Sequence, residues 1–513
     1  MLAFSACLKD LDQRPVVESE FDATEVYSSV DGFRGVLAKI YASYCIVGQE
    51  KGGGNADLSS NNGFDLLRGY FNMQESATDE LAGTWLSGDK IEFLTFMNWD
   101  ASDPWVSDTY YRLYYTISLC NEFLRNTGLA DGFSDTDKAT VATYAGEARF
   151  LRALAYWMVL DLYGKGPYVD ETMTVGGYMP EAYNSKQLFD YIESELKAIS
   201  MPKPSATEYG RASEAAAWTL LARLYLNAGV YGAGDHFSDC IECCKKVLAD
   251  GFSLESDYGK LFNAENHLRT NEIIFPFVID SRESVSWGAS TYIVCGQISH
   301  TDSEMAAAYG VNPGWGSFRV RGELPGMFGD VATTSDSRAR FFTTGRTQWF
   351  TGPIDNADEG FFSVKWTNLK DDGSTSCDTA SGGVDTDYPF FRLADVYLMA
   401  AEAVLRGGTG MTRSEALGLV NDLRTRAYGN ASGAVADADF NLDLILDERA
   451  RELYLEGQRR TDLIRFGKFT TSSYIWQWKG GVLDGRAVAD KYNLYPIPAA
   501  ELSANTNLKN ENY

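Results

Sequence analysis

Residues 447–468 read Asp447-Glu-Arg-Ala-Arg-Glu-Leu-Tyr-Leu-Glu-Gly-Gln-Arg-Arg-Thr-Asp-Leu-Ile-Arg-Phe-Gly-Lys468, and a short connection leads to Asn493-Leu-Tyr-Pro-Ile-Pro498. The first stretch predicts a charged helix over 448–468 that ends in a cationic-aromatic turn. Its charged side chains recur at spacings of three and four residues, which suit ion pairs along one helix. The residues concerned are Arg449, Glu452, Glu456 and Arg459. We expect them to belong to the scaffold and not to a site.

Two other stretches share the pattern Leu-Ala-x-aliphatic-Tyr-Leu-x-Ala, at residues 221–228 and 393–400. Each precedes a glycine-containing turn and a second amphipathic segment. Small residues let paired helices approach closely, and Tyr and Leu fill the groove, as in tetratricopeptide hairpins of about 34 residues. We therefore expect a mostly α-helical fold, a right-handed superhelix of several such hairpins with loop-rich insertions and a few short strands.

The chain divides into four consecutive parts of one integrated unit. They are an N-terminal tether over 1–20, a helical part over 21–250 with a loop-rich insertion at 48–108, a loop-rich insertion with short strands over 251–390, and a C-terminal helical part over 391–513. The clearest strand signal is the apolar run Glu272–Ile279, since β-branched and aromatic residues favour strands.

Composition restricts the possible partners. Forty-five basic against 71 acidic residues give a net charge of −26, which disfavours nucleic acid and anionic membranes as partners and suits a neutral or cationic ligand. No apolar run reaches the roughly 18 residues of a membrane helix. Cys240, Cys243 and Cys244 lack the second ligand pair of a zinc site, so we expect buried thiols there.

Catalytic motifs are absent from the sequence. It contains no nucleophile elbow, no His-Glu-x-x-His pair, no phosphate-binding loop and no dinucleotide fingerprint. Residues 355–360 depart from the calcium loop of an EF-hand, because Ala357 stands at a ligand position. We expect no catalytic residue, cofactor or metal ligand. A glycosidase needs only two carboxylates, so a glycoside hydrolase on a helical scaffold remains an alternative.

Aromatic residues in loop-like segments point to a ligand. The segments 79–85 and 93–105 set tryptophans beside amide and carboxylate groups. An indole face packs against the apolar C–H face of a sugar ring, while Asn and Asp bind its hydroxyl groups. Any single tryptophan is more often part of the core, but the group favours a carbohydrate site.

The N-terminal residues Met1-Leu-Ala-Phe-Ser-Ala-Cys7 look like the end of a lipoprotein signal, in which small residues precede an acylated cysteine. Six residues are too few for the charged and apolar regions of a signal peptide. The start is therefore truncated, misassigned or not a signal.

Five stretches in order resemble the SusD/RagB family. They are the segment ending at Cys7, the long helix 147–167, the segment 391–402, the helix 448–468 and the tail Tyr495-Pro-Ile-Pro498. The resemblance implies four tetratricopeptide-like units in a lipoprotein anchored through Cys7 on the outer face of a Bacteroidota-type outer membrane. It also implies a partner, a TonB-dependent SusC-like transporter over which the lipoprotein closes as a lid.

The same resemblance implies a function in nutrient uptake. We expect a non-enzymatic, cell-surface protein that captures oligo- or polysaccharide through loop aromatics and passes it to the transporter. The favoured residues are Trp85, Asn98 and Trp99, followed by Asp79, Trp105, Trp287, Tyr292 and Trp315. A transporter lid that binds only protein and serves non-glycan nutrients is the second alternative.

Overall fold

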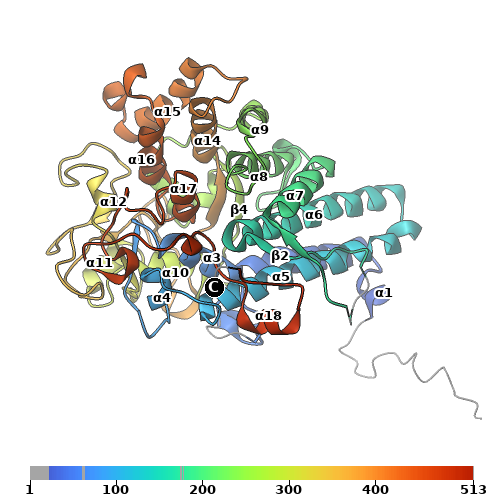
Figure 1. Ribbon diagram of the computed structural model, residues 1–513. Coiled ribbons are helices and arrows are strands. Elements are labelled where there is room, and N and C mark those ends of the chain that lie inside the picture. Colours follow the sequence, from blue (N-terminus) through green and yellow to red (C-terminus); the bar gives the residue numbers. More distant parts are fainter. Residues whose placement is uncertain (1–21, 60–63, 174–175, 177, 512) are drawn as a thin grey trace, which may run out of the picture.

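The computed structural model describes residues 22–59, 64–173, 176, 178–511 and 513 (Figure 1). Cys7 and the predicted tether over 1–20 lie outside these residues. The described chain is mostly helical with a few short strands, which confirms the predicted fold class. In the described ranges no helix is both long enough and apolar enough to cross a bilayer.

The helices are distributed along the whole chain. Their bounds are α1 Ala23–Val26, α2 Val30–Cys45, α3 Leu66–Glu75, α4 Glu92–Thr95, α5 Pro104–Arg125, α6 Asp135–Tyr163, α7 Ser185–Ala198, α8 Glu214–Leu226, α9 Phe237–Ala249, α10 Ala289–Gly296, α11 Ser303–Ala308, α12 Glu323–Gly326, α13 Thr379–Gly382, α14 Leu393–Leu405, α15 Arg413–Tyr428, α16 Leu442–Leu453, α17 Arg459–Arg465 and α18 Ala499–Ala504.

The strands form two-stranded antiparallel pairs. These are β1 (Leu81–Gly83) with β5 (Phe318–Val320), β2 (Lys165–Pro167) with β3 (Ala182–Asn184), β4 (Ile273–Phe277) with β8 (Tyr388–Arg392), and β6 (Phe341–Phe342) with β7 (Phe362–Ser363). The strand predicted over 272–279 is β4, and all of its residues are buried.

The long helix α6 shows how local sequence sets its ends. The Ser134 side chain accepts a hydrogen bond from the Asp137 N–H and caps the first turn. Gly164 ends the helix in the left-handed conformation, with φ 68°, which glycine adopts at little cost. Between them, residues 146–163 are buried almost without interruption, so α6 runs through the core.

The two copies of the repeated pattern lie on α8 and α14. Each packs against the helix that follows it, α9 and α15, and α9 also packs against α14, so the pairs stack (Figure 1). The copies differ at their third residue, where Arg223 and Asp395 stand. Arg223 Nε donates to Asp395 Oδ2 at 2.9 Å in the interior. One of the two variable positions of the pattern therefore joins the two repeats.

The stretch 448–468 is two helices and not one, which corrects the prediction. Helix α16 ends at Leu453, and α17 begins at Arg459. Between them Leu455 and Gly457 have positive φ, 56° and 74°. The backbone N–H groups of Leu455 and Gly457 donate to buried carboxylates, of Glu80 at 3.0 Å and Glu75 at 2.6 Å. Glu75 is the last residue of α3 and Glu80 directly precedes β1, so a distant segment fixes the turn.

The four charged residues predicted to pair along one helix instead pair with residues of other elements. Glu452 accepts from Arg392 at 2.6 Å and from Arg338 at 3.1 Å. Arg449 donates to Asp395 at 3.0 Å and to Asp462 at 2.7 Å. All of these side chains are buried. Although burial opposes ionisation, the arginines hold the pKa of Glu452 well below its usual range. The stretch therefore ties α16 to neighbouring elements.

Candidate functional site

Three of the predicted tryptophans lie together at the surface. Trp85 is 39% exposed, Trp287 is 37% exposed, and Trp315 between them is half-buried. The ring centroids of Trp85 and Trp315 are 6.3 Å apart with planes at 21°, and those of Trp287 and Trp315 are 6.2 Å apart at 54°. We call these residues the tryptophan cluster. The ring of Trp287 is tilted by 54° against that of Trp315, so the three indoles form a bent apolar surface.

The β1–β5 pair explains why Trp85 meets Trp315. Its register sets Gly83 opposite Phe318. Thr84 continues the pairing, because its N–H donates to the Ser317 carbonyl and its Oγ1 donates to the Gly316 carbonyl, both at 2.9 Å. Antiparallel strands carry the residue after one strand alongside the residue before the other. Both indoles therefore emerge at the same end of the pair.

The start of α10 positions Trp287. The Asp65 carboxylate accepts from the Ala289 N–H at 3.1 Å, and Arg68 Nη1 donates to the Trp287 carbonyl at 3.1 Å. Trp315 lies near the other end of the same helix, where its backbone N–H donates to the Cys295 carbonyl at 2.8 Å. The buried helix α10 therefore contacts both segments, with Trp287 just before its first residue and the Trp315 backbone bound to its last turn.

A glycine turn lies beside the cluster. Gly52 has φ 67°, and an added Cβ there would lie 3.2 Å from Trp287 Nε1. The turn is joined to the segment before Trp287 by the Gly52 N–H, which donates to the Val285 carbonyl at 3.1 Å. A side chain at residue 52 would be strained and would crowd the indole. The close approach accounts for glycine at this position.

Two other predicted tryptophans lie in the interior, which corrects their interpretation as ligand contacts. Trp99 and Trp105 are each 1% exposed. Trp99 Nε1 donates to the Tyr513 hydroxyl at 2.9 Å, and Trp105 Nε1 donates to the Asp89 carbonyl at 2.9 Å. Both indoles bury their apolar faces and satisfy their N–H groups within the protein, so they serve the core.

Asp79 and Tyr292 are also buried, and they too are corrected. Arg459 donates two hydrogen bonds of 2.7 Å to Asp79, and this arginine holds the pKa of Asp79 below its usual range despite burial. Tyr292 lies within α10, with the Arg68 guanidinium 3.8 Å from its ring centre. Asn98 is exposed, but among the described residues no hydrogen bond or ring contact joins it to the tryptophan cluster.

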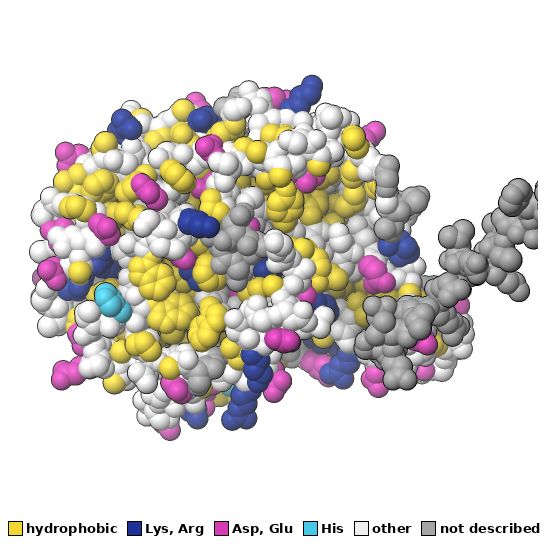
Figure 2. All heavy atoms as spheres, turned by 90° about the horizontal axis from the view of Figure 1, so that it is seen from below, with side chains coloured by type: hydrophobic (Ala, Val, Ile, Leu, Met, Phe, Trp, Pro, Cys, Tyr) yellow, Lys and Arg dark blue, Asp and Glu magenta, His cyan; other side chains and the backbone are white. Residues whose placement is uncertain are grey.

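His300 stands at the edge of the cluster and was not selected from the sequence. It is exposed, and its Nδ1 lies 3.0 Å from the position of an added Cβ on Gly316, the residue after Trp315. No motif surrounds His300 in the sequence, so only the folded loop reveals its position. Figure 2 shows hydrophobic side chains gathered on the face seen from below, together with a histidine.

Titratable groups behind the cluster are structural. Asp65 is buried and accepts hydrogen bonds from Ser286 and from the N–H groups of Arg68 and Ala289. Burial raises its pKa above the usual range, even though these donors oppose the shift. Among the described residues, no group of three or more His, Cys, Asp or Glu side chains is arranged to hold a metal ion. The site offers stacking surface and hydrogen bonds.

The chain is similar in sequence to known proteins. The starch-binding protein SusD of Bacteroides thetaiotaomicron is 34% identical over 99% of this chain and 96% of its own. A SusD-like protein of Bacteroides ovatus is 23% identical, over 76% of this chain and 71% of its own.

Solved structures share the fold. A SusD homolog of Bacteroides thetaiotaomicron has a TM-score of 0.74 at 19% identity and covers 98% of this chain and 99% of its own. Surface glycan-binding protein A of the same organism, in complex with laminarihexaose, has a TM-score of 0.71 at 18% identity, over 94% and 99%. The SusD family model matches residues 345–513. With the near-complete match to SusD itself, the chain belongs to the SusD family.

Proposed function

We propose that this protein is a cell-surface, glycan-binding lipoprotein that captures an oligo- or polysaccharide on the tryptophan cluster and delivers it to a TonB-dependent, SusC-like transporter. The observation that carries the proposal is the meeting of Trp85, Trp287 and Trp315 at the surface, from three separate segments. Exposed aromatic side chains held together at one place suggest binding rather than core packing.

The chemistry of the cluster suits a neutral glycan. Indole faces pack against the C–H faces of sugar rings, and a bent surface suits a chain that curves. The net charge of −26 disfavours an anionic polysaccharide. Because the relative that is 34% identical is named a starch-binding protein, an α-linked glucan is the first ligand to test.

Affinity electrophoresis in gels that contain amylopectin tests the site. We expect the wild type to be retarded, and Trp85→Ala and Trp315→Ala each to lose most of that retardation. Trp349→Ala is the matched control, because Trp349 is also exposed, at 46%, and belongs to another loop. Full retardation of both cluster variants would refute the site. Release of reducing sugar, abolished by one carboxylate substitution, would instead favour a hydrolase.

The anchor and the transporter belong to the same proposal. A cysteine with several acyl chains would hold the protein at a membrane, whereas a single chain binds only marginally. When the chain is expressed with a complete signal peptide, Cys7→Ser should move the protein from the membrane fraction to the supernatant. Equal membrane retention of the variant and the wild type would contradict the lipid anchor. Co-purification with a barrel transporter from the native membrane tests the partner.

A further inference from the structure

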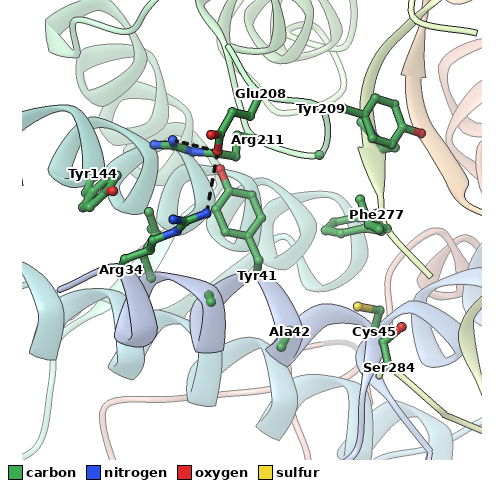
Figure 3. Close-up of a pocket in the computed structure, with 15 residues that line it drawn as sticks. Arg34, Tyr41, Ala42, Cys45, Tyr144, Glu208, Tyr209, Arg211, Phe277 and Ser284 are labelled. Carbon is green, nitrogen blue, oxygen red and sulfur yellow. Dashed lines mark hydrogen bonds and ion pairs between the residues drawn. The ribbon is translucent and has the colours of Figure 1, made fainter. Parts of the chain in front are cut away.

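A second hollow lies apart from the tryptophan cluster, between α2, the loop 208–211 and the end of β4. Its volume is about 370 Å³. Figure 3 shows Arg34 and Tyr41 rising from α2 toward Glu208 and Arg211. We call it the α2 pocket. Its remaining lining residues are Leu37, Ala38, Ala42, Cys45, Tyr144, Tyr209, Gly210, Pro276, Phe277, Val278 and Ser284.

The floor of the α2 pocket is apolar. Leu37, Tyr41 and Cys45 recur at intervals of four residues, so they share one face of α2 and turn it toward the pocket. Phe277 and Val278 face them from the end of β4, and Val278 is 43% exposed. Aliphatic and aromatic surface left open at a concave site is typical of ligand pockets of this size.

The rim carries balanced charges. Arg34 and Glu208 are each about two-thirds exposed and lie 4.0 Å apart, a loose pair with free hydrogen-bonding capacity. Deeper in, Arg211 pairs with the buried Glu147, which also accepts from the Tyr41 hydroxyl at 2.6 Å. The two arginines offset the two glutamates. A charged ligand would take one partner of an existing ion pair and leave the other partner without a counter-charge. The rim therefore favours a neutral ligand.

One buried carboxylate fixes two walls of the pocket. Asp387 accepts from the Tyr209 hydroxyl at 2.6 Å and from the Ile279 N–H at 2.8 Å. The first donor belongs to the loop 208–211 and the second to the segment that follows β4. Since both walls are tied to the same group, the pocket is formed before any ligand arrives, which lowers the entropy cost of binding.

The α2 pocket and the tryptophan cluster share a segment. Ser284 lines the pocket, and Trp287, three residues later, belongs to the cluster. Three residues span at most about 11 Å. The backbone at the edge of the pocket is therefore within this distance of the backbone at Trp287.

We propose that the α2 pocket is a second carbohydrate site, which holds a terminal sugar or short branch of the glycan bound at the cluster. The apolar floor contacts the C–H face of the ring, and Arg34 and Glu208 supply a donor and an acceptor to neighbouring hydroxyl groups. Walls on three sides suit a chain end, whereas the open cluster suits a continuous chain. The ligand class rests on the proposed function.

Saturation-transfer NMR with maltotriose and laminaritriose as probes tests this site. The double variant Trp85→Ala/Trp315→Ala isolates the α2 pocket, and we expect it to keep a weaker transfer signal than the wild type. Ala38 is exposed on α2 and lines the pocket, so Ala38→Trp, added to the double variant, fills the pocket with an indole. It should abolish the remaining transfer signal. Gly35→Trp is the control, because Gly35 is exposed on the same helix, has no heavy atom within 4 Å of an added Cβ, and does not line the pocket.

Each outcome is decisive. If the wild type gives a signal and the double variant gives none, the pocket takes no sugar while the proposed function stands. If the signal of the double variant survives Ala38→Trp, the second site lies elsewhere and the proposal fails. If no variant binds either trisaccharide, both the pocket and the proposed function are overturned. Circular dichroism of each variant confirms that the fold is intact.

Discussion

Glu75 and Glu80 form a buried carboxyl pair at the turn between α16 and α17. Glu75 accepts from the N–H group of Gly457, and Glu80 accepts from the N–H group of Leu455. Burial raises the pKa of Glu75 to about 7. Burial, and then the charge of Glu75, raise the pKa of Glu80 well above its usual range. Near neutral pH the pair therefore holds a proton.

This pair predicts that stability falls as pH rises through neutrality. The pKa values are higher in the folded protein than the roughly 4.3 of an unfolded glutamate, so the folded state binds more protons. Their contribution is complete below about pH 4.3 and is lost as pH rises through the folded values. We expect a lower Tm at pH 8 than at pH 6, measured by calorimetry.

A substitution separates this pair from other titrating groups. Glu80→Gln mimics the protonated side chain, because its amide can donate to Glu75 and its oxygen can accept from Leu455. It should reduce the fall in Tm between pH 6 and pH 8. Glu80→Ala, which leaves the Leu455 N–H without its acceptor, should lower Tm at both pH values. An identical pH slope in Glu80→Gln and the wild type would show that other groups cause the fall.

Among the elements, the β1–β5 pair sets the geometry of the cluster. Thr84 Oγ1 donates to the Gly316 carbonyl just beyond the strands, next to both indoles. Thr84→Val removes this hydrogen bond, which is worth about 1 kcal/mol, and keeps the shape of the side chain. We expect a loss of glycan affinity of up to about fivefold, measured by titration calorimetry with a maltooligosaccharide.

The matched control is Thr143→Val on α6. This threonine also donates to a backbone carbonyl, that of Ala139 at 3.1 Å, and is partly exposed on α6, outside the strand pair. It should leave the affinity unchanged. Equal affinity of Thr84→Val and the wild type would mean that the strands alone hold Trp85 against Trp315.

Helices could be predicted from the sequence where local signals agree. The periodicity and terminal glycine of α6, and the repeated pattern of α8 and α14, act within one turn or one helix pair. The break at 454–458 could not be predicted in this way. Leu455 takes a positive φ because Glu80 accepts its N–H from another part of the fold. Such tertiary contacts override helix propensity without leaving a local pattern.

The candidate site could be predicted only in part for a similar reason. Trp85 and Trp99 both lie in loop-like sequence beside polar residues, yet one is exposed and the other donates to Tyr513 in the interior. Burial depends on which distant segment covers the ring, and the sequence near it carries no such information. The chemistry of the loop aromatics could be recognised, whereas the meeting of Trp85, Trp287 and Trp315 required the fold.

At the scale of the whole molecule, the charge of −26 predicts how salt acts on binding. A neutral glucan held by stacking should bind equally well at low and high salt. A carboxylated or sulfated polysaccharide should bind less well at low salt, because screening lengthens from about 8 Å at 0.15 M to about 30 Å at 0.01 M. Affinity electrophoresis at both ionic strengths measures this. Weaker retardation by amylopectin at high salt would indicate a charged contact.

Residues 74–80 bind residues 455–461, which the ribosome adds much later. Asp79 and its partner Arg459 are 380 residues apart. At about 5 to 20 residues per second, a ribosome needs roughly 20 to 75 s to add that length. During this time Asp79 lacks its native partner Arg459. A polypeptide that ends before α17 lacks the partner of Asp79, so its residues 74–80 should be cut more readily by an added protease than those of the full chain.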